Sequence, residues 1–156
     1  MEYQPVKPSL KFLFQATVNI GPANHVSKVP LGERRFIPII GGSFKGKTLS
    51  GEVLPGGADW QLVRPDGSVL LYARYTLRTK DDAYIYVENR GIRWGKPEVL
   101  AQLARGDTTD PAKYYFRTTP QFETGAPQYT WLNNTIAVCS GMRLINAVII
   151  DFYSVL

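Results

Sequence analysis

Two strand-like segments separated by only three residues constrain the fold of this chain most. Residues 68–79 and residues 83–93 each alternate apolar and polar side chains, which is the period of a half-buried strand. The three residues between them, Lys80-Asp81-Asp82, leave room only for a tight reversal of the chain. The two segments are therefore predicted to form an antiparallel hairpin with a three-residue loop.

That loop length predicts which side chains share a face of the hairpin. One face is polar and aromatic, and its expected cross-strand pairs are Arg74 with Glu88, Thr76 with Tyr86, and Arg78 with Tyr84. The other face is apolar, and it carries Leu71, Ala73, Tyr75, Leu77, Ile85 and Val87. A two-residue loop would break this pairing, so the contact of Arg74 with Glu88 depends on the register.

Further short strands separated by turn signals predict a barrel or a sandwich rather than a helical fold. The strongest turn signal is Pro65-Asp66-Gly67. The other expected strands are residues 11–18, 35–40, 48–54, 60–63, 114–119, 135–140 and 144–155. One helix is predicted between residues 96 and 106, because Pro97 suits a first helical position and Gly106 suits an end. This helix is expected to be a plug or lid at one end of a barrel, or a simple crossover.

Size and composition indicate one globular domain over residues 1–156. The chain has 44% hydrophobic and 20% charged residues, and it lacks the run of roughly 20 apolar residues that crosses a bilayer. Its net charge of +5 is dispersed along the sequence, which argues against a nucleic-acid groove. The N-terminus does not resemble a secretory signal, so a cytoplasmic protein with no membrane partner is expected.

Three familiar kinds of site are disfavoured. His25 and Cys139 are the only residues of their types, which is too few for a common zinc site, and Cys139 is expected to be a small core residue. A Ser-His-Asp or Cys-His catalytic site would depend wholly on His25, which is instead expected to be exposed in a loop. Residues 41–48 match the spacing of a phosphate-binding loop, but a strand rather than a helix is predicted to follow. We therefore expect neither a metal nor a cofactor.

The segment from Gly51 to Gln61 is the best candidate for the rim of a binding cavity. Its adjacent glycines, Gly56 and Gly57, permit a sharp turn directly before Asp59 and Trp60. Burial beside an indole would raise the pKa of the Asp59 carboxyl and suit it to proton transfer. Asp59 is therefore the predicted general acid or base.

Other polar and aromatic residues on strands are predicted to join Asp59 if they face the inside of a barrel. The predicted catalytic partners are Arg74 and Arg117, which would polarise a carbonyl or stabilise an oxyanion. The predicted ligand-binding residues are Trp60, Glu88, Tyr115, Glu123 and Trp131. The alternative is that Arg74 and Glu88 form an external ion pair and that the tryptophans belong to the core.

Several motifs together resemble the domain of unknown function 3237 family, also called uncharacterised protein family 0311. They include Arg35-Phe36-Ile37-Pro38-Ile39, Pro55-Gly56-Gly57-Ala58-Asp59-Trp60-Gln61, Ala73-Arg74-Tyr75, Ile85-Tyr86-Val87, Tyr115-Phe116-Arg117-Thr118, Phe122-Glu123-Thr124 and Trp131-Leu132-Asn133. The chain departs from the family pattern at Asp82, where glycine is expected. The resemblance implies a small antiparallel β-barrel, calycin-like or allene-oxide-cyclase-like, and no settled activity.

By analogy with such barrels, the leading hypothesis is a cofactor-free isomerase, cyclase or lyase acting on an aromatic or oxygenated metabolite. The alternatives are a non-catalytic carrier or sensor of a small apolar ligand, and a protein-interaction module. A polar-lined cavity containing Asp59 and an arginine favours the enzyme, an all-apolar cavity favours the carrier, and a filled barrel favours the interaction module. The apolar C-terminal strand would suit a homodimer contact.

Overall fold

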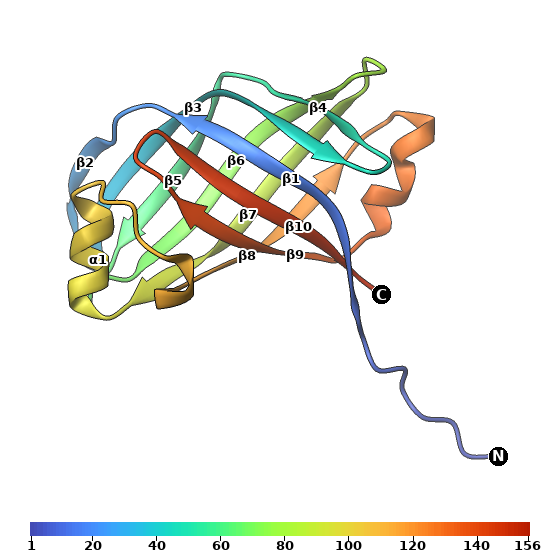
Figure 1. Cartoon of the computed structure of the whole chain (residues 1–156), viewed down its shortest axis with the longest axis horizontal. Helices are drawn as coiled ribbons and strands as arrows, with labels where there is room; N and C mark the ends of the chain where they lie inside the picture. Colours follow the sequence, from blue (N-terminus) through green and yellow to red (C-terminus); the bar gives the residue numbers. More distant parts are fainter.

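All ten strands of the protein belong to one antiparallel sheet that closes into a barrel (Figure 1). The computed structural model describes residues 1–156. The strands are β1 (Leu10–Ile20), β2 (Asn24–Val29), β3 (Gly32–Gly46), β4 (Ser50–Val53), β5 (Gly57–Val63), β6 (Val69–Thr79), β7 (Tyr84–Gly95), β8 (Tyr114–Glu123), β9 (Ala137–Arg143) and β10 (Ala147–Val155). The predicted all-β barrel class is confirmed.

The barrel closes because β1 pairs with β10 along one side and with β3 along the other. Going round the ring, β4 and β5 share a single position between β3 and β6, so the closed barrel has eight strand positions. Gly42 has a φ of 138° and lies opposite Val18, and a Cβ there would be 2.0 Å from the carbonyl oxygen of Thr17. Glycine is needed at this position for β1 and β3 to approach closely enough to close the ring.

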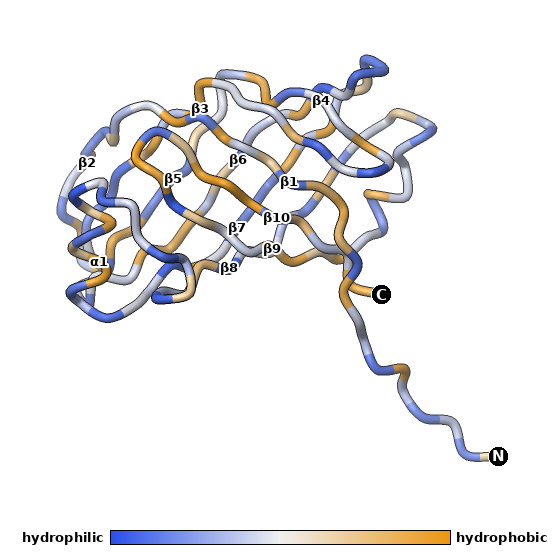
Figure 2. The backbone as a smooth tube through the Cα atoms, viewed as in Figure 1, coloured by the Kyte–Doolittle hydropathy of each residue, from blue (hydrophilic) through white to orange (hydrophobic).

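The predicted hairpin of β6 and β7 is confirmed in its register. Arg74 lies opposite Glu88, Thr76 opposite Tyr86 and Arg78 opposite Tyr84. Asp82 has a φ of 66°, which is the left-handed conformation that glycine adopts most readily. The hairpin tip is hydrophilic (Figure 2). Arg74 and Glu88 do not form an ion pair, because the Glu88 Oε1 atom accepts a 2.8 Å hydrogen bond from the Tyr86 hydroxyl while the Arg74 guanidinium lies over the ring of Tyr72.

The single α-helix, α1 (Pro97–Ala104), lies within the predicted range and covers one end of the barrel (Figure 1). Its Val99 and Leu103 are buried against Val69, Leu71 and Phe116 of the barrel wall. Two 3₁₀ segments were not predicted, η1 (Pro111–Lys113) and η2 (Pro127–Asn134). The η2 segment lies at the other end of the barrel, where Leu132 is buried in the core.

The two ends of the barrel interior differ in packing. Toward η2, the rings of Phe14 and Phe152 stack with their centroids 4.3 Å apart, and Phe44 and Phe122 pack against Phe14. These aromatic rings belong to a cluster of 20 buried hydrophobic residues that also extends along the barrel interior to Ile37 and Ile39. An eight-stranded barrel is just wide enough either to be filled by side chains or to hold one small ligand. The end toward α1 is the one that remains hollow.

Three expectations about local sequence features can also be compared with the structure. The sequence did not predict β2, and the exposed His25 lies on this strand rather than in a loop. Residues 41–46 belong to β3 and no helix follows them, so they do not form a phosphate-binding loop. Cys139 is buried in the core as predicted, and burial raises the pKa of its thiol to about 12.

Candidate functional site

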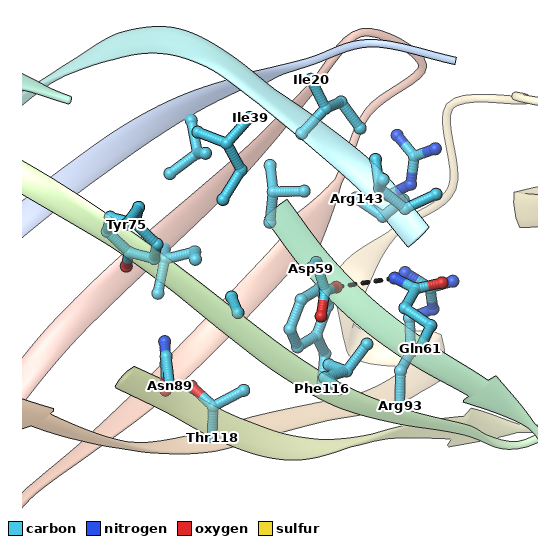
Figure 3. Close-up of a pocket in the computed structure, with 16 residues that line it drawn as sticks. Ile20, Ile39, Asp59, Gln61, Tyr75, Asn89, Arg93, Phe116, Thr118 and Arg143 are labelled. Carbon is cyan, nitrogen blue, oxygen red and sulfur yellow. Dashed lines mark hydrogen bonds between the residues drawn. The ribbon is translucent and has the colours of Figure 1, made fainter. Parts of the chain in front are cut away.

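The barrel encloses a cavity, whose lining side chains are drawn in Figure 3. The space inside it in which the centre of a water molecule can lie is about 50 Å³. Ten of the sixteen lining residues are hydrophobic: Val18, Ile20, Ile37, Ile39, Leu71, Ala73, Tyr75, Phe116, Val148 and Ile150. The remaining six are polar or charged: Asp59, Gln61, Asn89, Arg93, Thr118 and Arg143. A mainly apolar hollow with a few converging polar groups is the usual form of a small-molecule site.

Four buried side-chain atoms in the protein have no hydrogen-bond partner, and all four belong to residues that line this cavity. They are Tyr75 Oη, Asn89 Oδ1, Arg93 Nε and Thr118 Oγ1. An unpartnered buried polar group costs roughly 1–3 kcal/mol, so native proteins contain few of them. Their collection in one cavity provides donors and acceptors for a polar molecule bound there.

Asp59 reaches the cavity from β5, where a strand's period of two turns it inward and turns Trp60 outward. Its Oδ2 accepts a hydrogen bond from Gln61 Nε2 at 2.7 Å, and its Oδ1 accepts one from the backbone N–H of Tyr72 at 2.9 Å. The residue as a whole is half-buried and lines the cavity. Burial raises the pKa of Asp59 although both hydrogen bonds and nearby arginines act in the opposite direction.

Three arginines from three different strands lie close to this carboxyl: Arg35 from β3, Arg93 from β7 and Arg143 from β9. Burial, together with the charges of Arg143 and Arg35, lowers the pKa of Arg93 to about 10. Arg93 is only 7% exposed, and its guanidinium lies 5.7 Å from the centre of the Phe116 ring. The site therefore holds more positive than negative charge.

A second pocket of about 350 Å³ adjoins the cavity beneath α1. The two share four lining residues, Ile37, Gln61, Arg93 and Arg143. We call this pocket the vestibule; its other lining residues are Ala23, His25, Arg35, Val63, Gly67, Val69, Leu100, Leu103 and Ala104. The cavity and the vestibule together form one site at the α1 end of the barrel.

Of the three predicted catalytic residues, the structure places only Asp59 in the cavity. Arg74 and Arg117 lie on the outer face of the barrel, because each alternates with inward-facing neighbours on its strand. Arg74 lines a shallow outer depression, and the Arg117 guanidinium lies 5.4 Å from the ring centre of Tyr115. Neither guanidinium joins Asp59, and Arg93 and Arg143 occupy the expected position instead.

The five predicted ligand-binding residues also lie outside the cavity. Trp60 is 42% exposed and packs on Phe36, and Tyr115 is 44% exposed beside Trp94. Glu88 and Glu123 line a shallow outer groove with Tyr86, and Trp131 is on η2 and 40% exposed. Trp60 and Trp131 therefore lie neither in the cavity nor in the core, the two positions expected for them.

Most of the polar cavity residues that were not predicted could have been found from their spacing along the strands, because they lie an even number of positions from a buried apolar residue of their own strand. Asn89 and Arg93 lie an even number of residues from the apolar Ile85 and Val87 on β7 and so share their face. Thr118 shares a face with Phe116 on β8 in the same way. Arg143 shares the inward face of β9 with Cys139. Polar or charged residues that share the apolar face of a strand indicate that polar groups point into the barrel.

Residues 8–155 match the family described as protein of unknown function, DUF3237. This chain belongs to the DUF3237 family. A UPF0311 protein of Rhodopseudomonas palustris is 47% identical over 94% of this chain and 95% of its own length. The crystal structure of a conserved protein of unknown function from that organism has a TM-score of 0.94 at 45% identity, covering 97% of this chain and all of that one. A β-barrel-like protein of Acinetobacter baumannii has a TM-score of 0.88 at 45% identity, covering 99% and 100% of the two chains.

Two fungal proteins are more distant from this DUF3237 protein. An enzyme from Penicillium herquei has the same fold, with a TM-score of 0.74 at 22% identity and full coverage of both chains. PR-toxin biosynthesis cluster protein 7 of Penicillium roqueforti is 25% identical over 81% of this chain and 78% of its own length. None of the helices here is long and apolar enough to span a membrane.

Proposed function

We propose that this DUF3237 protein binds a small aromatic or oxygenated molecule in the cavity and isomerises, cyclises or dehydrates it without a cofactor. The observation that carries the proposal is that every unpartnered buried side-chain polar atom lines the same mainly apolar hollow as Asp59. An all-apolar cavity would have favoured a carrier, and a filled barrel an interaction module. The combination of Asp59 with arginines supports the enzyme.

Asp59 is the proposed general acid or base. Two hydrogen bonds hold its carboxyl in one orientation, and its raised pKa brings it closer to the range in which a carboxyl both gives and takes a proton near neutrality. Arg93 has an unpartnered Nε in the same cavity and is the proposed donor to a substrate carbonyl oxygen. In an enolisation step, Asp59 takes the proton from the carbon next to the carbonyl. The electron pair of that C–H bond forms a C=C bond, the π pair of the carbonyl moves to the oxygen that Arg93 stabilises, and Asp59 then returns the proton to a different atom as the carbonyl re-forms.

The name of the Penicillium roqueforti relative places that protein in a toxin biosynthesis cluster. A reaction of a small organic molecule in the cavity of this protein would be consistent with that relative's name. A carrier or sensor remains the second candidate, because most of the lining residues are hydrophobic.

The proposal is tested with 4-phenylbutan-2-one, a neutral ketone with an apolar ring and exchangeable protons next to its carbonyl. Incorporation of deuterium from D₂O into these positions is followed by proton NMR with wild-type protein and with Asp59→Asn. We expect the wild type to accelerate exchange and Asp59→Asn to lower the rate by roughly 10²-fold. Asp107→Asn removes an exposed carboxylate outside the cavity and should leave exchange unchanged.

A structural role for Asp59 predicts a different result. Asp59→Asn would then lower the melting temperature while exchange per folded molecule stayed at the wild-type rate, and Asp59 would be removed from the mechanism. A ketone that binds without any exchange in the wild type would favour the carrier.

A further inference from the structure

The vestibule beneath α1 is unusual in the charges of its lining. Three arginines and the only histidine of the chain line it, and no Asp or Glu does. Asp59 of the neighbouring cavity supplies one negative charge against the three guanidinium groups. Glu33 lies nearby at the rim, where its Oε1 is 2.9 Å from His25 Nδ1.

The three arginines are not neutralised by contacts with carboxylates. The ion pairs of the protein with oxygen and nitrogen atoms within 4.0 Å involve only His25, Arg78 and Arg105 on the positive side. Buried like charges that repel one another cost free energy unless a negative group offsets them. The arrangement therefore favours an anion over a neutral molecule in the vestibule.

Hydrogen bonds hold two of the three arginine side chains, Arg35 and Arg143, in place. Arg35 Nε donates to Gln61 Oε1 at 2.8 Å, and Arg143 Nη1 donates to the carbonyl oxygens of Leu144 and Ile145. Arg93 has an Nε without a partner. Guanidinium groups fixed in this way are well suited to a planar carboxylate, which accepts two parallel N–H bonds from one arginine.

The rest of the vestibule indicates an organic anion. Seven of its thirteen lining residues are hydrophobic, among them Leu100 and Leu103 of α1. The adjoining cavity continues the apolar surface past Ile37 and ends at Tyr75, Asn89 and Thr118 (Figure 3). A carboxylate among the arginines would therefore leave the body of the same molecule in the cavity.

We propose that the natural ligand is an organic carboxylate, whose carboxylate group binds to Arg35, Arg93 and Arg143 in the vestibule and whose apolar body occupies the cavity beside Asp59. This inference rests on the proposed function, because it names the class of molecule that the same site takes. The carboxylate lies nearest α1, and the body of the molecule extends toward Tyr75, Asn89 and Thr118.

The test compares three molecules of nearly the same shape by isothermal titration calorimetry. 3-Phenylpropanoate carries the carboxylate, and 3-phenylpropanamide and 4-phenylbutan-2-one are its neutral counterparts. With the wild type, we expect the acid to bind at least about 10-fold more tightly than either neutral molecule, because a fixed guanidinium bonds most strongly to a charged acceptor. Equal affinities for the three molecules would overturn the inference.

Variants then locate the preference. Arg143→Met and Arg35→Met replace half-buried arginines and are expected to reduce the preference for the acid to about 3-fold or less, with little change for the amide. Arg117→Met removes an exposed guanidinium of the outer face and is the matched control, expected to keep the full preference. A preference that survives in both vestibule variants would also overturn the inference. If either variant does not fold, Arg143→Lys keeps the charge without the planar fork and should show an intermediate preference.

The inference and the proposed function fail in different ways. If the amide and the ketone bind and Asp59-dependent exchange is observed, but the acid binds no more tightly, only the carboxylate inference is overturned. If the acid binds tightly through the vestibule and Asp59→Asn leaves exchange unchanged, the carboxylate inference stands and the catalytic role of Asp59 falls.

Discussion

Gln61 lies two residues beyond Asp59 on β5, and its Nε2 donates a 2.7 Å hydrogen bond to the Oδ2 atom of that carboxyl. The same amide accepts a 2.8 Å hydrogen bond from Arg35 Nε through Oε1. The Asp59 and Gln61 side chains both face inward because side chains two residues apart lie on the same face of a strand. Gln61 thus links the carboxyl of the cavity to an arginine of the vestibule without allowing the two charges to touch.

Gln61→Leu should therefore lower the free energy of unfolding by about 1–3 kcal/mol, because it leaves a donor on Arg35 and an acceptor on Asp59 without partners. Chemical denaturation followed by circular dichroism measures the change. Gln121→Leu, on the exposed face of β8, is the matched control and should have a much smaller effect. A Gln61→Leu variant as stable as the wild type would show that the link between the two charges is unimportant for folding.

The raised pKa of Asp59 predicts how stability depends on pH. The folded state holds the Asp59 proton more tightly than the unfolded state, whose carboxyl has a pKa of about 3.9. The stabilisation from the protonated carboxyl is thus complete below about pH 3.9 and is lost as the pH rises through the folded-state pKa. Asparagine does not titrate, so Asp59→Asn should gain stability relative to the wild type as the pH rises above about 4, and the gain should level off above the folded-state pKa of Asp59. Denaturation of both proteins in the same buffers cancels the titration of other groups, and a flat difference would contradict the raised pKa.

The cavity itself can be tested by partly filling it. Ala73 lines the cavity from β6, and Ala73→Val adds two carbon atoms that point into it. We expect binding of 3-phenylpropanamide to weaken by at least about 10-fold, while the melting temperature stays within about 5 °C of the wild type because valine suits a strand. Ala58→Val changes a half-buried position that lines only the outer depression, and it should leave binding intact. Undiminished binding to Ala73→Val would place the ligand elsewhere.

The left-handed backbone of Asp82 at the β6–β7 turn predicts a contrast between two substitutions. Asp82→Ala removes the 2.7 Å contact with Arg78 and still has a Cβ in the left-handed conformation, so its melting temperature should be lower than that of the wild type. Asp82→Gly removes the same contact but tolerates a positive φ, so it should be more stable than Asp82→Ala. Thermal unfolding of the two variants measures the difference, and equal melting temperatures would assign the whole effect to the ion pair.

Local pattern was enough to predict a large part of this fold. The three-residue loop and the alternation on each side of it determined the register of β6 and β7, and the face with Leu71, Tyr75 and Ile85 does point into the barrel. The helix between residues 96 and 106 followed from its proline and glycine. These features depend on neighbours in sequence, which is why the residues alone specified them. β2 was missed because all six of its residues lack the alternation of a half-buried strand.

The predicted site was wrong about which face of each strand points into the barrel. Arg74 and Arg117 were grouped with Asp59 because they are charged and lie on strands, although the hairpin register already placed Arg74 opposite the apolar face. Parity along one strand states which residues share a side, but closure of the ring decides which side becomes the interior.

The sequence by itself therefore determined most of the strands, the main hairpin, the helix and the family. Only the tertiary structure decided that Asp59 meets Arg35, Arg93 and Arg143, which come from β3, β7 and β9 and are up to 108 residues apart along the chain. The physical reason is that hydrogen bonding between distant strands closes the barrel, and this closure brings inward-facing polar groups together at the one end that the aromatic core does not fill.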